Sequence, residues 1–436
     1  MMKKKLFISL FGMTSIILSG CAFEFNYILP NNPFKGSSSS IEDYEDDIDD
    51  SGSYEIKIWC DQRIKELTTQ QVNDFATASN GKYKIEFTVD TTGEDAAASS
   101  MIENVQAGAD IFIFAQDQLS RLKTAGALSS FTGGIYNTVV KETDADGISA
   151  ASLNGKLYAL PFTSDNGYFM YYNKDVLGED DVKDMATMCE KLHSKGKKLN
   201  YQVFSNGWYG ASYFMATGCT SEWTIDPTTN KFSAFNDNYR ENGIDACKGL
   251  LSLKKYKDAP YNLFSTKDVT DLKKGLGAIV SGIWDYELAS SLLGDKLGCC
   301  ELPSFTVEGK SIHLSSFKGY KLIGVKPTND SKKLSVCKKI ARFLTTKDAQ
   351  LDRFERVKWA PTNKDALGLD KVQNHPAVSA LLAQSKYAKP QLQTPSSWFG
   401  AVALIGTKLS GDPNGANNIS ACLQEYYDTL PSFLDD

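Results

Sequence analysis

The hydrophobic and polar residues beyond residue 53 switch repeatedly between the period of a strand and that of a helix. Residues 54–59, YEIKIW, alternate polar and apolar side chains one by one, as a half-buried strand does. Apolar side chains then recur at approximately helical spacing, at Ile64, Leu67, Val72 and Phe75. The pair Asn80-Gly81 that follows is typical of a helix C-terminus. This first unit therefore predicts a strand followed by a helix.

The same alternation continues along the chain. Strands are predicted at 83–89 and 109–115, and the second of these is apolar enough to be fully buried. Helices are expected around 101–107, 117–128, 182–195, 240–256 and 331–357. Because strands alternate with helices, we expect an α/β fold with a parallel sheet and helices on both of its faces.

A polar joint separates two apolar segments in the stretch GKLYALPFTSDNGYFMYYNKDVL, residues 155–177. A short strand ends at Pro161, polar residues 163–166 follow, and an aromatic-rich strand occupies 168–172. Alternation along this second strand predicts one buried face and one exposed face. The polar joint itself indicates a segment whose groups face water or a ligand.

The first residues have the features of an export signal. MMKKK is basic, and the 13 apolar residues LFISLFGMTSIIL that follow are too few for a membrane-spanning helix, which needs roughly 20. Leu18-Ser19-Gly20-Cys21 resembles the bacterial lipobox, which implies cleavage before Cys21 and attachment of lipid to that residue. An uncleaved anchor helix is the alternative. Either way, the body of the protein is expected outside the cytoplasm and close to a membrane.

Residues 21–53 are expected to be a disordered acidic tether, since the segment GSSSSIEDYEDDIDDSGS has little to bury. The tether also accounts for most of the net charge of −6. Residues 1–53 hold 4 basic and 8 acidic side chains, which leaves 43 and 45 in the remainder, a net charge of −2. A body so nearly neutral does not suggest a nucleic-acid partner.

At 436 residues and 42% hydrophobic content the chain can fill the cores of two domains. Besides Cys21 it has eight cysteines at irregular spacing, with Cys299 and Cys300 adjacent. We favour free thiols over a disulfide framework, although an exported chain keeps the second possibility open. No Cys-x-x-Cys is present, the three histidines are scattered, and GLGAIVSG (275–282) and DADG (144–147) lack the spacing of a phosphate or calcium loop. We therefore expect no metal and no cofactor.

Several blocks of residues, taken together and in order, resemble a known family. They are ADIFIFAQDQLSRLKTAGALSSF, GKLYALPFTSDNGYFMYYNKDVL, GLGAIVSGIWDYELAS, LPSF with GYKLIGV after it, and KPQLQTPSSWFGAVALIG. These blocks are similar to those of the extracellular solute-binding proteins of ABC sugar importers (family 1), the maltose/maltodextrin-binding group in particular. The block Gly-Lys-x-Tyr-x-x-Pro-Phe followed by Tyr-Asn-Lys-Asp is the most specific of them.

The resemblance implies a two-lobe periplasmic-binding-protein fold of type II, with discontinuous lobes joined by crossing hinge strands. We expect the N-terminal lobe at 54–162 plus 318–360 and the C-terminal lobe at 163–317 plus 361–436. The crossings are then expected at 161–166, 317–321 and 360–363. In this interpretation the polar joint after Pro161 is the first crossing, which passes over the floor of the cleft.

The resemblance also implies a function. The chain would capture an oligosaccharide by lobe closure and deliver it to ABC transporter permease subunits, as a monomer anchored in the membrane through lipid on Cys21. Two residues depart from the maltodextrin pattern, because Phe114 stands where that group often has Trp and Gln118 where it often has a basic residue. These two differences count against maltose as the ligand more than they count against sugar binding in general.

A sugar needs hydrogen-bonding groups for its hydroxyls and a flat aromatic side chain for its apolar ring face. Such residues should lie on loops at the ends of strands. The polar candidates are Asp61, Gln116, Asp117, Asp165 and Asn166. The stacking candidates are Trp208, Trp284 and Trp398, with Phe399 as the alternative to Trp398.

Most candidates also have a structural interpretation. Asp117 can cap the following helix, and Asp165 can bond the amides of crossing strands. Trp398 or Phe399 can belong to the core, and Arg63 can be a solvated residue at a helix start. Trp59, Trp223 and Trp359 are expected to be structural.

Other functions remain as alternatives. A surface glycoside hydrolase could use Asp117 and Asp165 as paired carboxylates, which would require a separation of roughly 5–9 Å. No block of the sequence resembles a glycosidase site, so we expect no enzymatic activity. An adhesin or sensor is a further possibility. A glycerol phosphate ligand would call for cations in the cleft, and a polyamine would hardly need three aromatic platforms.

Overall fold

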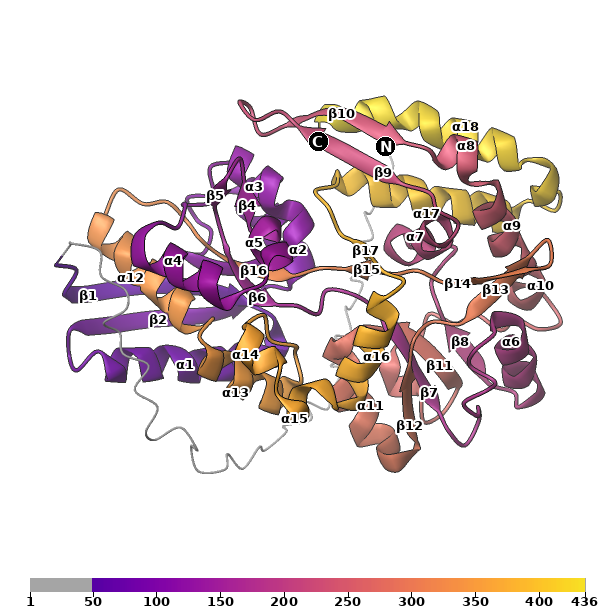
Figure 1. The fold of residues 1–436 in the computed structure, drawn as a ribbon, viewed down its shortest axis with the longest axis horizontal. Helices are drawn as coiled ribbons and strands as arrows, with labels where there is room; N and C mark the ends of the chain where they lie inside the picture. Colours follow the sequence, from indigo (N-terminus) through magenta and orange to yellow (C-terminus); the bar gives the residue numbers. More distant parts are fainter. Residues whose placement is uncertain (1–48, 436) are drawn as a thin grey trace, which may run out of the picture. The chain divides into compact units, whose positions relative to one another are not determined.

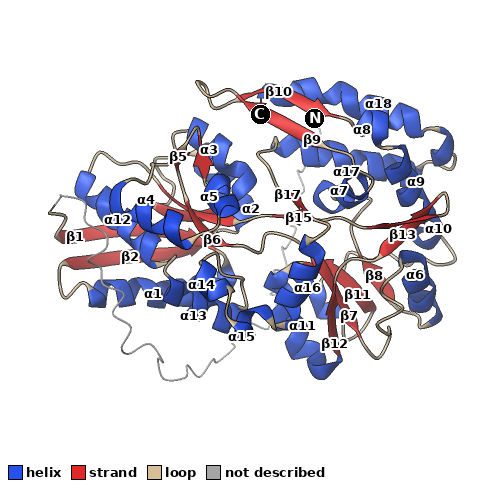
Figure 2. Ribbon diagram, in the orientation of Figure 1, coloured by secondary structure: helices blue, strands red, loops and turns tan. Residues whose placement is uncertain are grey.

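The computed structural model describes residues 49–435, which build two β-sheets, each packed against helices (Figures 1 and 2). The expected signal segment, Cys21 and most of the expected tether lie outside the described residues. Among residues 49–435, no helix combines the length and the apolar character needed to cross a membrane.

The first sheet contains strands from distant parts of the chain. In spatial order they are β2 (Tyr83–Thr91), β1 (Gly52–Cys60), β3 (Ile111–Ala115), β16 (Lys321–Val325) and β6 (Leu160–Thr163). Strand β1 is parallel to β2 and to β3, as the sequence predicts, whereas β16 is antiparallel to β3 and to β6. A late segment of the chain therefore completes a sheet that the first residues of the body begin.

The second sheet is also assembled from separated segments, in the order β12 (Leu297–Cys300), β7 (Phe169–Asn173), β11 (Leu276–Ser281) and β8 (Lys198–Asn200). The remaining strands form four small two-stranded sheets. They are β4 (Ser152–Leu153) with β5 (Lys156–Leu157), β9 (Ser221–Ile225) with β10 (Phe232–Asp237), β13 (Ser304–Val307) with β14 (Lys310–His313), and β15 (Phe317–Lys318) with β17 (Lys389–Pro390).

We call the two halves the first and second lobes, after the sheets that they contain. The helices of the first lobe are α1 (Lys65–Ala78), α2 (Glu94–Glu103), α3 (Leu119–Thr124), α4 (Gly133–Glu142), α5 (Ala145–Ala150), α12 (Ser331–Phe343) and α13 (Lys347–Val357). Those of the second are α6 (Met185–Ser194), α7 (Gly207–Ala216), α8 (Tyr239–Asn242), α9 (Ile244–Ser252), α10 (Lys254–Lys257), α11 (Tyr286–Leu293), α16 (Pro376–Ser385), α17 (Ser396–Gly411) and α18 (Ile419–Thr429).

Two short helices, α14 (Lys364–Leu367) and α15 (Asp370–Gln373), come after the third expected crossing. Helix α14 packs against α13 of the first lobe, and α15 follows it. Helix α14 thus packs with the first lobe, although the expected boundary assigns 361–436 to the second. The lobe boundaries themselves stay a prediction.

Several predicted elements are confirmed in place but differ in extent. The helix expected at 101–107 is α2, which begins at Glu94 and ends at Glu103, because residues 104–108 form a turn closed by a bond from the Gly108 N–H to the Asn104 carbonyl. The long helix expected at 331–357 is two helices, since Thr346 caps the start of α13 through the Ala349 N–H.

The expectation of one exposed face for strand 168–172 is wrong. Side chains from both faces of this strand are buried, with exposures between 0 and 4%. Phe169 and Tyr171 belong to one hydrophobic cluster, whereas Tyr168, Met170 and Tyr172 belong to another. Since β7 is an interior strand with packed side chains on both sides of its sheet, polar alternation is not required there.

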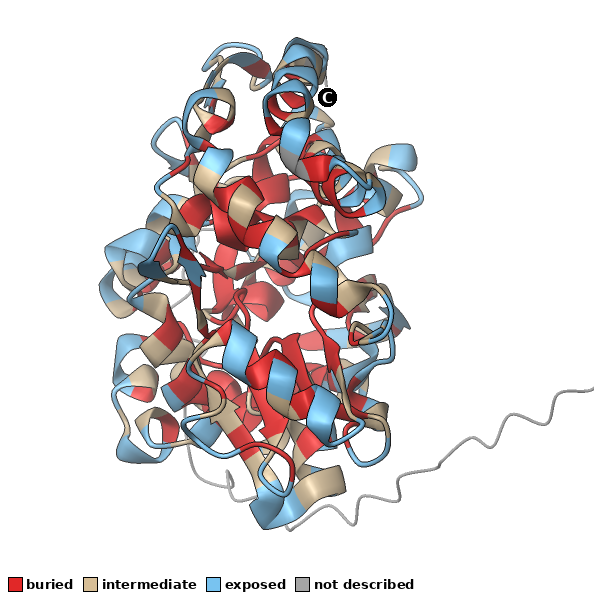
Figure 3. Cartoon of the chain, turned by 90° about the vertical axis from the view of Figure 1, so that its right-hand side faces the viewer, coloured by how far each residue is buried: buried red, intermediate tan, exposed pale blue. Residues whose placement is uncertain are grey.

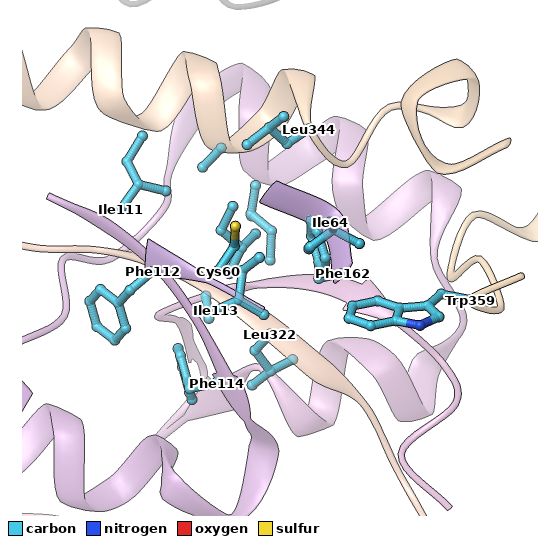
Figure 4. Close-up of a cluster of buried hydrophobic side chains, with 14 of the residues drawn as sticks. Cys60, Ile64, Ile111, Phe112, Ile113, Phe114, Phe162, Leu322, Leu344 and Trp359 are labelled. Atoms are coloured by element: carbon cyan, nitrogen blue, oxygen red, sulfur yellow. The ribbon is translucent and has the colours of Figure 1, made fainter. Parts of the chain in front are cut away.

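The cores of the two lobes contain large aromatic and aliphatic side chains, and the buried segments run through the middle of the sheets in Figure 3. In the first lobe, Trp359 stands at the edge of such a cluster beside Ile64 and Phe162 (Figure 4). All eight cysteines of the described residues are free thiols, and five of them are buried.

The three expected crossings lie side by side. The Ser164 N–H donates to the Ala360 carbonyl at 3.0 Å, and the Thr362 hydroxyl donates to the Pro161 carbonyl at 3.0 Å. The Asn166 N–H donates to the Gly319 carbonyl at 3.1 Å, which joins the second crossing to the first. The segments that connect the two sheets are therefore hydrogen-bonded to one another.

Candidate functional site

The predicted polar residues of the first lobe follow the carboxyl ends of neighbouring strands. Asp61 comes directly after β1, and Gln116 and Asp117 come directly after β3. Since β1 and β3 are adjacent and parallel, both ends point to the same edge of the sheet. The structure thus brings these residues to one edge, as the sequence pattern predicts.

One side chain that the sequence analysis did not single out connects most of the predicted site. The Gln391 carboxamide, 4% exposed, donates to Asp117 Oδ1 at 2.8 Å. Its oxygen accepts hydrogen bonds from Asn166 Nδ2 and from the Trp208 indole N–H, each at 3.1 Å. The Gln116 side chain donates to the Gln391 carbonyl. Four of the nine predicted ligand-binding residues therefore meet at Gln391.

Asp117 is held in an environment that changes its ionisation. The residue is 3% exposed, and its second carboxylate oxygen accepts a bond from Gln118. Burial raises the pKa of the Asp117 carboxyl to about 6, although the bonds from Gln118 and Gln391 oppose this. Its side chain accepts from these two glutamines, one at each oxygen, and each oxygen keeps a second lone pair for a further donor.

Asp61 and Arg63 form a bidentate ion pair, with Arg63 Nε 2.8 Å and Nη2 2.7 Å from the two carboxylate oxygens. Burial alone would raise the pKa of Asp61, but the bonds from Arg63 outweigh it and hold the pKa below its ordinary value. Arg63 also donates to the carbonyl of Trp284 at 3.2 Å. This bond links the first lobe to the second, so Arg63 is more than a solvated residue at a helix start.

Lys321 lies between two indole rings. Its ammonium is 3.8 Å from the centre of the Trp359 ring and 5.2 Å from that of Trp284. Two carboxylates lie near it, Asp165 at 3.5 Å and Glu94 at 4.0 Å. The lysine, which is 4% exposed, therefore sets the position of both rings.

Asp165 occupies the position of its structural interpretation. Its side chain accepts from the Thr163 hydroxyl at 2.6 Å and from the Ala360 N–H at 2.7 Å, and it pairs with Lys321. These partners belong to the three crossings, and Asp165 itself is 0% exposed. Its oxygens bond the crossings, which fits the structural interpretation, and its role in ligand binding stays a prediction.

The aromatic candidates form a continuous row, which we call the aromatic row and define as Trp284, Trp208, Phe317 and Phe399. Ring centres are 6.1 Å apart for Trp284 and Trp208, 6.3 Å for Trp208 and Phe317, and 6.1 Å for Phe317 and Phe399. Trp208, Trp284 and Phe399 are partly exposed. The two predicted tryptophans therefore lie in contact, on one surface.

Two glycines make the row possible. A side chain at Gly207 would meet the Phe399 carbonyl at 1.9 Å, so only glycine lets the start of α7 approach the start of α17 this closely. A side chain at Gly282 would overlap the Trp284 ring at 2.1 Å. The Trp284 ring thus lies over the backbone of Gly282.

Trp398 does not belong to the aromatic row. It is 3% exposed, and its indole N–H donates to the Tyr426 hydroxyl at 2.7 Å, within the core of the second lobe. Of the pair at 398–399, Phe399 is therefore the one placed to stack on a ligand. Trp398 has the core position that the sequence analysis considered as its alternative.

Two buried polar atoms beside Lys321 have no hydrogen-bond partner among residues 49–435. They are Glu94 Oε1 and Trp359 Nε1. The Glu94 side chain is 12% exposed, and burial raises the pKa of its carboxyl. Buried polar atoms are nearly always hydrogen-bonded, so Glu94 Oε1, whose nearest cation is the Lys321 ammonium at 4.0 Å, keeps the capacity to accept from a polar ligand.

Sequence reasoning missed Glu94, Lys321 and Gln391. Glu94 is the first residue of the helix after β2. Its place just after the end of a strand could have identified it as a candidate. Lys321 lies 37 to 227 residues from its partners and Gln391 lies 183 to 275 residues from its own, so no local pattern connects them. We call the assembled group the candidate site. Its members are Asp61, Arg63, Glu94, Gln116, Asp117, Asn166, Trp208, Trp284, Lys321, Gln391 and Phe399.

A separate cavity of about 540 Å³ adjoins the same hinge segments. Its lining includes Ser164, Gly167 and Gly319 of the crossings, Asp144 of the first lobe and Leu381 of α16. Trp208, Trp284 and Asp117 do not line it. The cavity is thus distinct from the candidate site, although Gln116 and Phe317 border both.

The candidate site combines partly exposed rings with carboxylates and amides held by other protein groups. Ionised and amide acceptors of this kind suit hydroxyl donors, and the rings suit flat apolar surfaces. The two cations present, Arg63 and Lys321, are already paired with carboxylates. Two lobes with such a surface between their sheets define a ligand-binding protein.

Comparison of the sequence with known families gives the same class. The profile of a family described as bacterial extracellular solute-binding protein matches residues 70–380. The chain belongs to this family, which confirms the family predicted from the sequence blocks. A search of proteins with curated function found no match.

Solved structures agree in fold. A structure solved with acarbose is 26% identical, with a TM-score of 0.74 over 88% of this chain and 100% of the other. The maltodextrin-binding protein MalE1 from L. casei BL23 is 20% identical, with a TM-score of 0.72 over 87% and 99%. A maltotriose-binding protein of Thermus thermophilus is 17% identical, with a TM-score of 0.68 over 86% and 100%. The predicted two-lobe periplasmic-binding-protein fold is confirmed.

Replacement of Gln391 by Leu tests its role as the junction of the site. The side chain keeps its approximate volume but leaves Asp117, Asn166 and the Trp208 N–H without their partner, so the free energy of unfolding should fall by about 1–3 kcal/mol. Urea unfolding measures this change. Gln424→Leu is the matched control, since Gln424 also donates to a carboxylate, Asp428, but is exposed. Equal effects of the two substitutions would contradict the assignment.

Proposed function

We propose that this protein captures an oligosaccharide between its two lobes and presents it to an ABC transporter. The observation that carries the proposal is the contact between the aromatic row and the Asp117–Gln391–Asn166 network. The Trp208 ring belongs to the row, while its N–H donates to Gln391. A flat ring face and a set of hydroxyl-binding groups are thus adjacent on one surface.

The similarities in fold support the same ligand class. The structures compared above were solved with acarbose, named as a maltodextrin-binding protein, or bound with maltotriose. Because Phe114 is fully buried, the position where the maltodextrin group often has Trp adds no ring to the site of this chain. A maltodextrin or another oligosaccharide is therefore the proposed ligand, with no single sugar specified.

The anchoring proposal rests on sequence. Leu18-Ser19-Gly20-Cys21 supports lipid attachment at Cys21, which would hold the body at the outer face of the cell membrane. We also propose that the protein is a monomer.

A glycoside hydrolase is the weaker alternative. It would need two carboxylates free to act on a glycosidic bond, one as acid and one as base or nucleophile. Asp117 has a raised pKa, but Asp165 is fully buried and bonded to the crossings. The pair considered in the sequence analysis therefore has only one member that faces the candidate site.

Calorimetric titration with a series of maltooligosaccharides tests the proposed function, together with an assay for reducing ends after long incubation. We expect binding at micromolar affinity or better and no release of product, because Asp165, the second carboxylate of the pair considered above, is bonded to the crossings. Binding accompanied by new reducing ends would favour the hydrolase, and no heat with any of the sugars would contradict the sugar ligand.

Substitution of two tryptophans separates ligand stacking from core packing. Trp284→Ala should weaken sugar affinity by about 2 kcal/mol or more, because a central aromatic anchor is lost. Trp398→Ala should instead lower the free energy of unfolding by about 3–5 kcal/mol and change the affinity little. Calorimetry and thermal melting measure both variants. If Trp284→Ala binds as the wild type does, Trp284 does not contact the ligand.

Affinity should depend on pH through Asp117. The ionised carboxylate is the stronger acceptor for a sugar hydroxyl, and the pKa of about 6 means that it is ionised at pH 7 and protonated at pH 5. Affinity should therefore fall by up to about ten-fold from pH 7 to pH 5. The contribution of Asp117 to the free energy of unfolding changes with pH in the opposite direction to the affinity. The raised pKa favours the folded state at low pH, and this contribution is lost as pH rises from 3.8 to about 6.

Asp117→Asn provides the control, since an amide cannot titrate in this range. Its affinity should show no step near pH 6 when it is titrated with the same sugar. A step of unchanged size in this variant would assign the pH dependence to another group, of which Glu94 and Asp285 also have raised pKa values.

A further inference from the structure

The β9–β10 hairpin is built rigidly into the second lobe. Trp223 on β9 is 8% exposed and packs against Phe232 and Phe235 on β10, with ring centres 5.9 and 5.3 Å away, and against Phe433 at 6.2 Å. Asp237 at the end of β10 accepts from the Tyr426 hydroxyl at 2.6 Å. Both strands of the hairpin are therefore fixed to helix α18 and to the C-terminal residues.

The turn of this hairpin, residues 226–230, is held in one conformation by its own side chains. Asp226 Oδ1 accepts from the N–H groups of Thr228 at 2.7 Å and Thr229 at 2.8 Å. The Asn230 N–H donates to the Asp226 carbonyl at 2.8 Å. Asn230 has φ of 56°, a left-handed conformation that Asn tolerates better than most residues. The turn thus presents the Asn230 carbonyl in a fixed direction.

That carbonyl accepts two hydrogen bonds from the first lobe. Ser120 Oγ donates to it at 2.7 Å and Thr124 Oγ1 at 2.8 Å. The two hydroxyls stand four residues apart on one face of α3. Figure 1 shows the tip of the hairpin next to α3.

A second contact lies beside the first. Asn154, in the turn between β4 and β5, donates to the Pro227 carbonyl at 3.0 Å and to Asn230 Oδ1 at 3.2 Å. Ser120 also uses its backbone N–H, which donates to Gln393 Oε1 at 2.9 Å. Ser120 follows Asp117 by three residues, so these bonds join the two lobes at the end of the candidate site that contains Asp117.

We propose that the 226–230 turn is a latch that holds the two lobes closed. The proposal rests on the proposed function in one respect, namely that the lobes open and close around a ligand. The bonds to Asn230 join residues of different lobes and involve no group of the aromatic row. Separation of the lobes would break them, so they stabilise the arrangement in which the lobes touch whether or not a ligand is present.

A contact of this kind has a distinctive effect on binding. A ligand that binds the closed state more tightly than the open state has an apparent affinity proportional to the closed population. Loss of the latch lowers this population by one factor, which applies equally to every ligand. Loss of a side chain that contacts the ligand instead changes the affinities for different ligands by different factors.

The test uses the full chain with Ser120→Ala and Thr124→Val together, which removes both donors and leaves the Ser120 N–H in place. The Kd values for maltotriose and maltotetraose, measured by tryptophan fluorescence, should both rise about ten-fold with their ratio unchanged. This rise in Kd should come from a faster dissociation rate, which stopped-flow experiments measure. Small-angle X-ray scattering without sugar should give a larger radius of gyration than for the wild type.

Two control variants sharpen the result. Thr77→Val with Ser291→Ala removes two exposed hydroxyls that bond only within their own segments, and should leave the affinity and the scattering unchanged. Asn230→Gly keeps the left-handed turn and its carbonyl but loses the bond from Asn154, and should raise each Kd by about two- to three-fold.

If the ratio of the two Kd values changed, Ser120 or Thr124 would contact the ligand, and the latch proposal would be wrong. An unchanged radius of gyration in the double variant would overturn it as well. If the wild-type chain binds neither sugar, the proposed ligand is wrong, while the scattering comparison still decides whether the turn holds the lobes together.

Discussion

The structure depends on the carboxylate of Asp165. This fully buried group accepts from Thr163 of the first crossing, pairs with Lys321 at the end of the second, and accepts from the Ala360 N–H of the third. A buried charge left unpaired is costly, so each crossing must stay in place for the others to be satisfied. One carboxylate thus ties together the segments that connect the two sheets.

The candidate site is an extension of this hinge. Lys321 pairs with Asp165 on one side and contacts the rings of Trp284 and Trp359 on the other. Asn166, the next residue along the first crossing, binds Gln391, which in turn holds Asp117 and Trp208. A change in the position of the crossings would therefore also move the groups proposed to bind sugar.

The polar groups have two kinds of role, which residue type alone does not separate. Asp61, Asp117 and Asp165 are all buried aspartates near strand ends. Asp61 is paired with Arg63, Asp165 is taken up by the hinge, and Asp117 bonds only neutral amides and has a raised pKa. Among the three, Asp117 is thus the carboxylate whose charge is least compensated by neighbouring cations.

The sequence by itself determined the α/β class, the positions of most strands and helices, and the family. These follow from local periodicity, from turn residues such as Asn80-Gly81, and from blocks of residues read in order. It also placed Asp61, Gln116, Asp117, Trp208 and Trp284 at strand or helix ends, because strand ends are visible in the hydrophobic pattern. Only the tertiary structure decided the assignment of Asp165 to the hinge, of Trp398 to the core and of Gln391 to the centre of the site. Each of these depends on partners about 30 to more than 270 residues away, and no local pattern of hydrophobic and polar residues records which distant groups will meet.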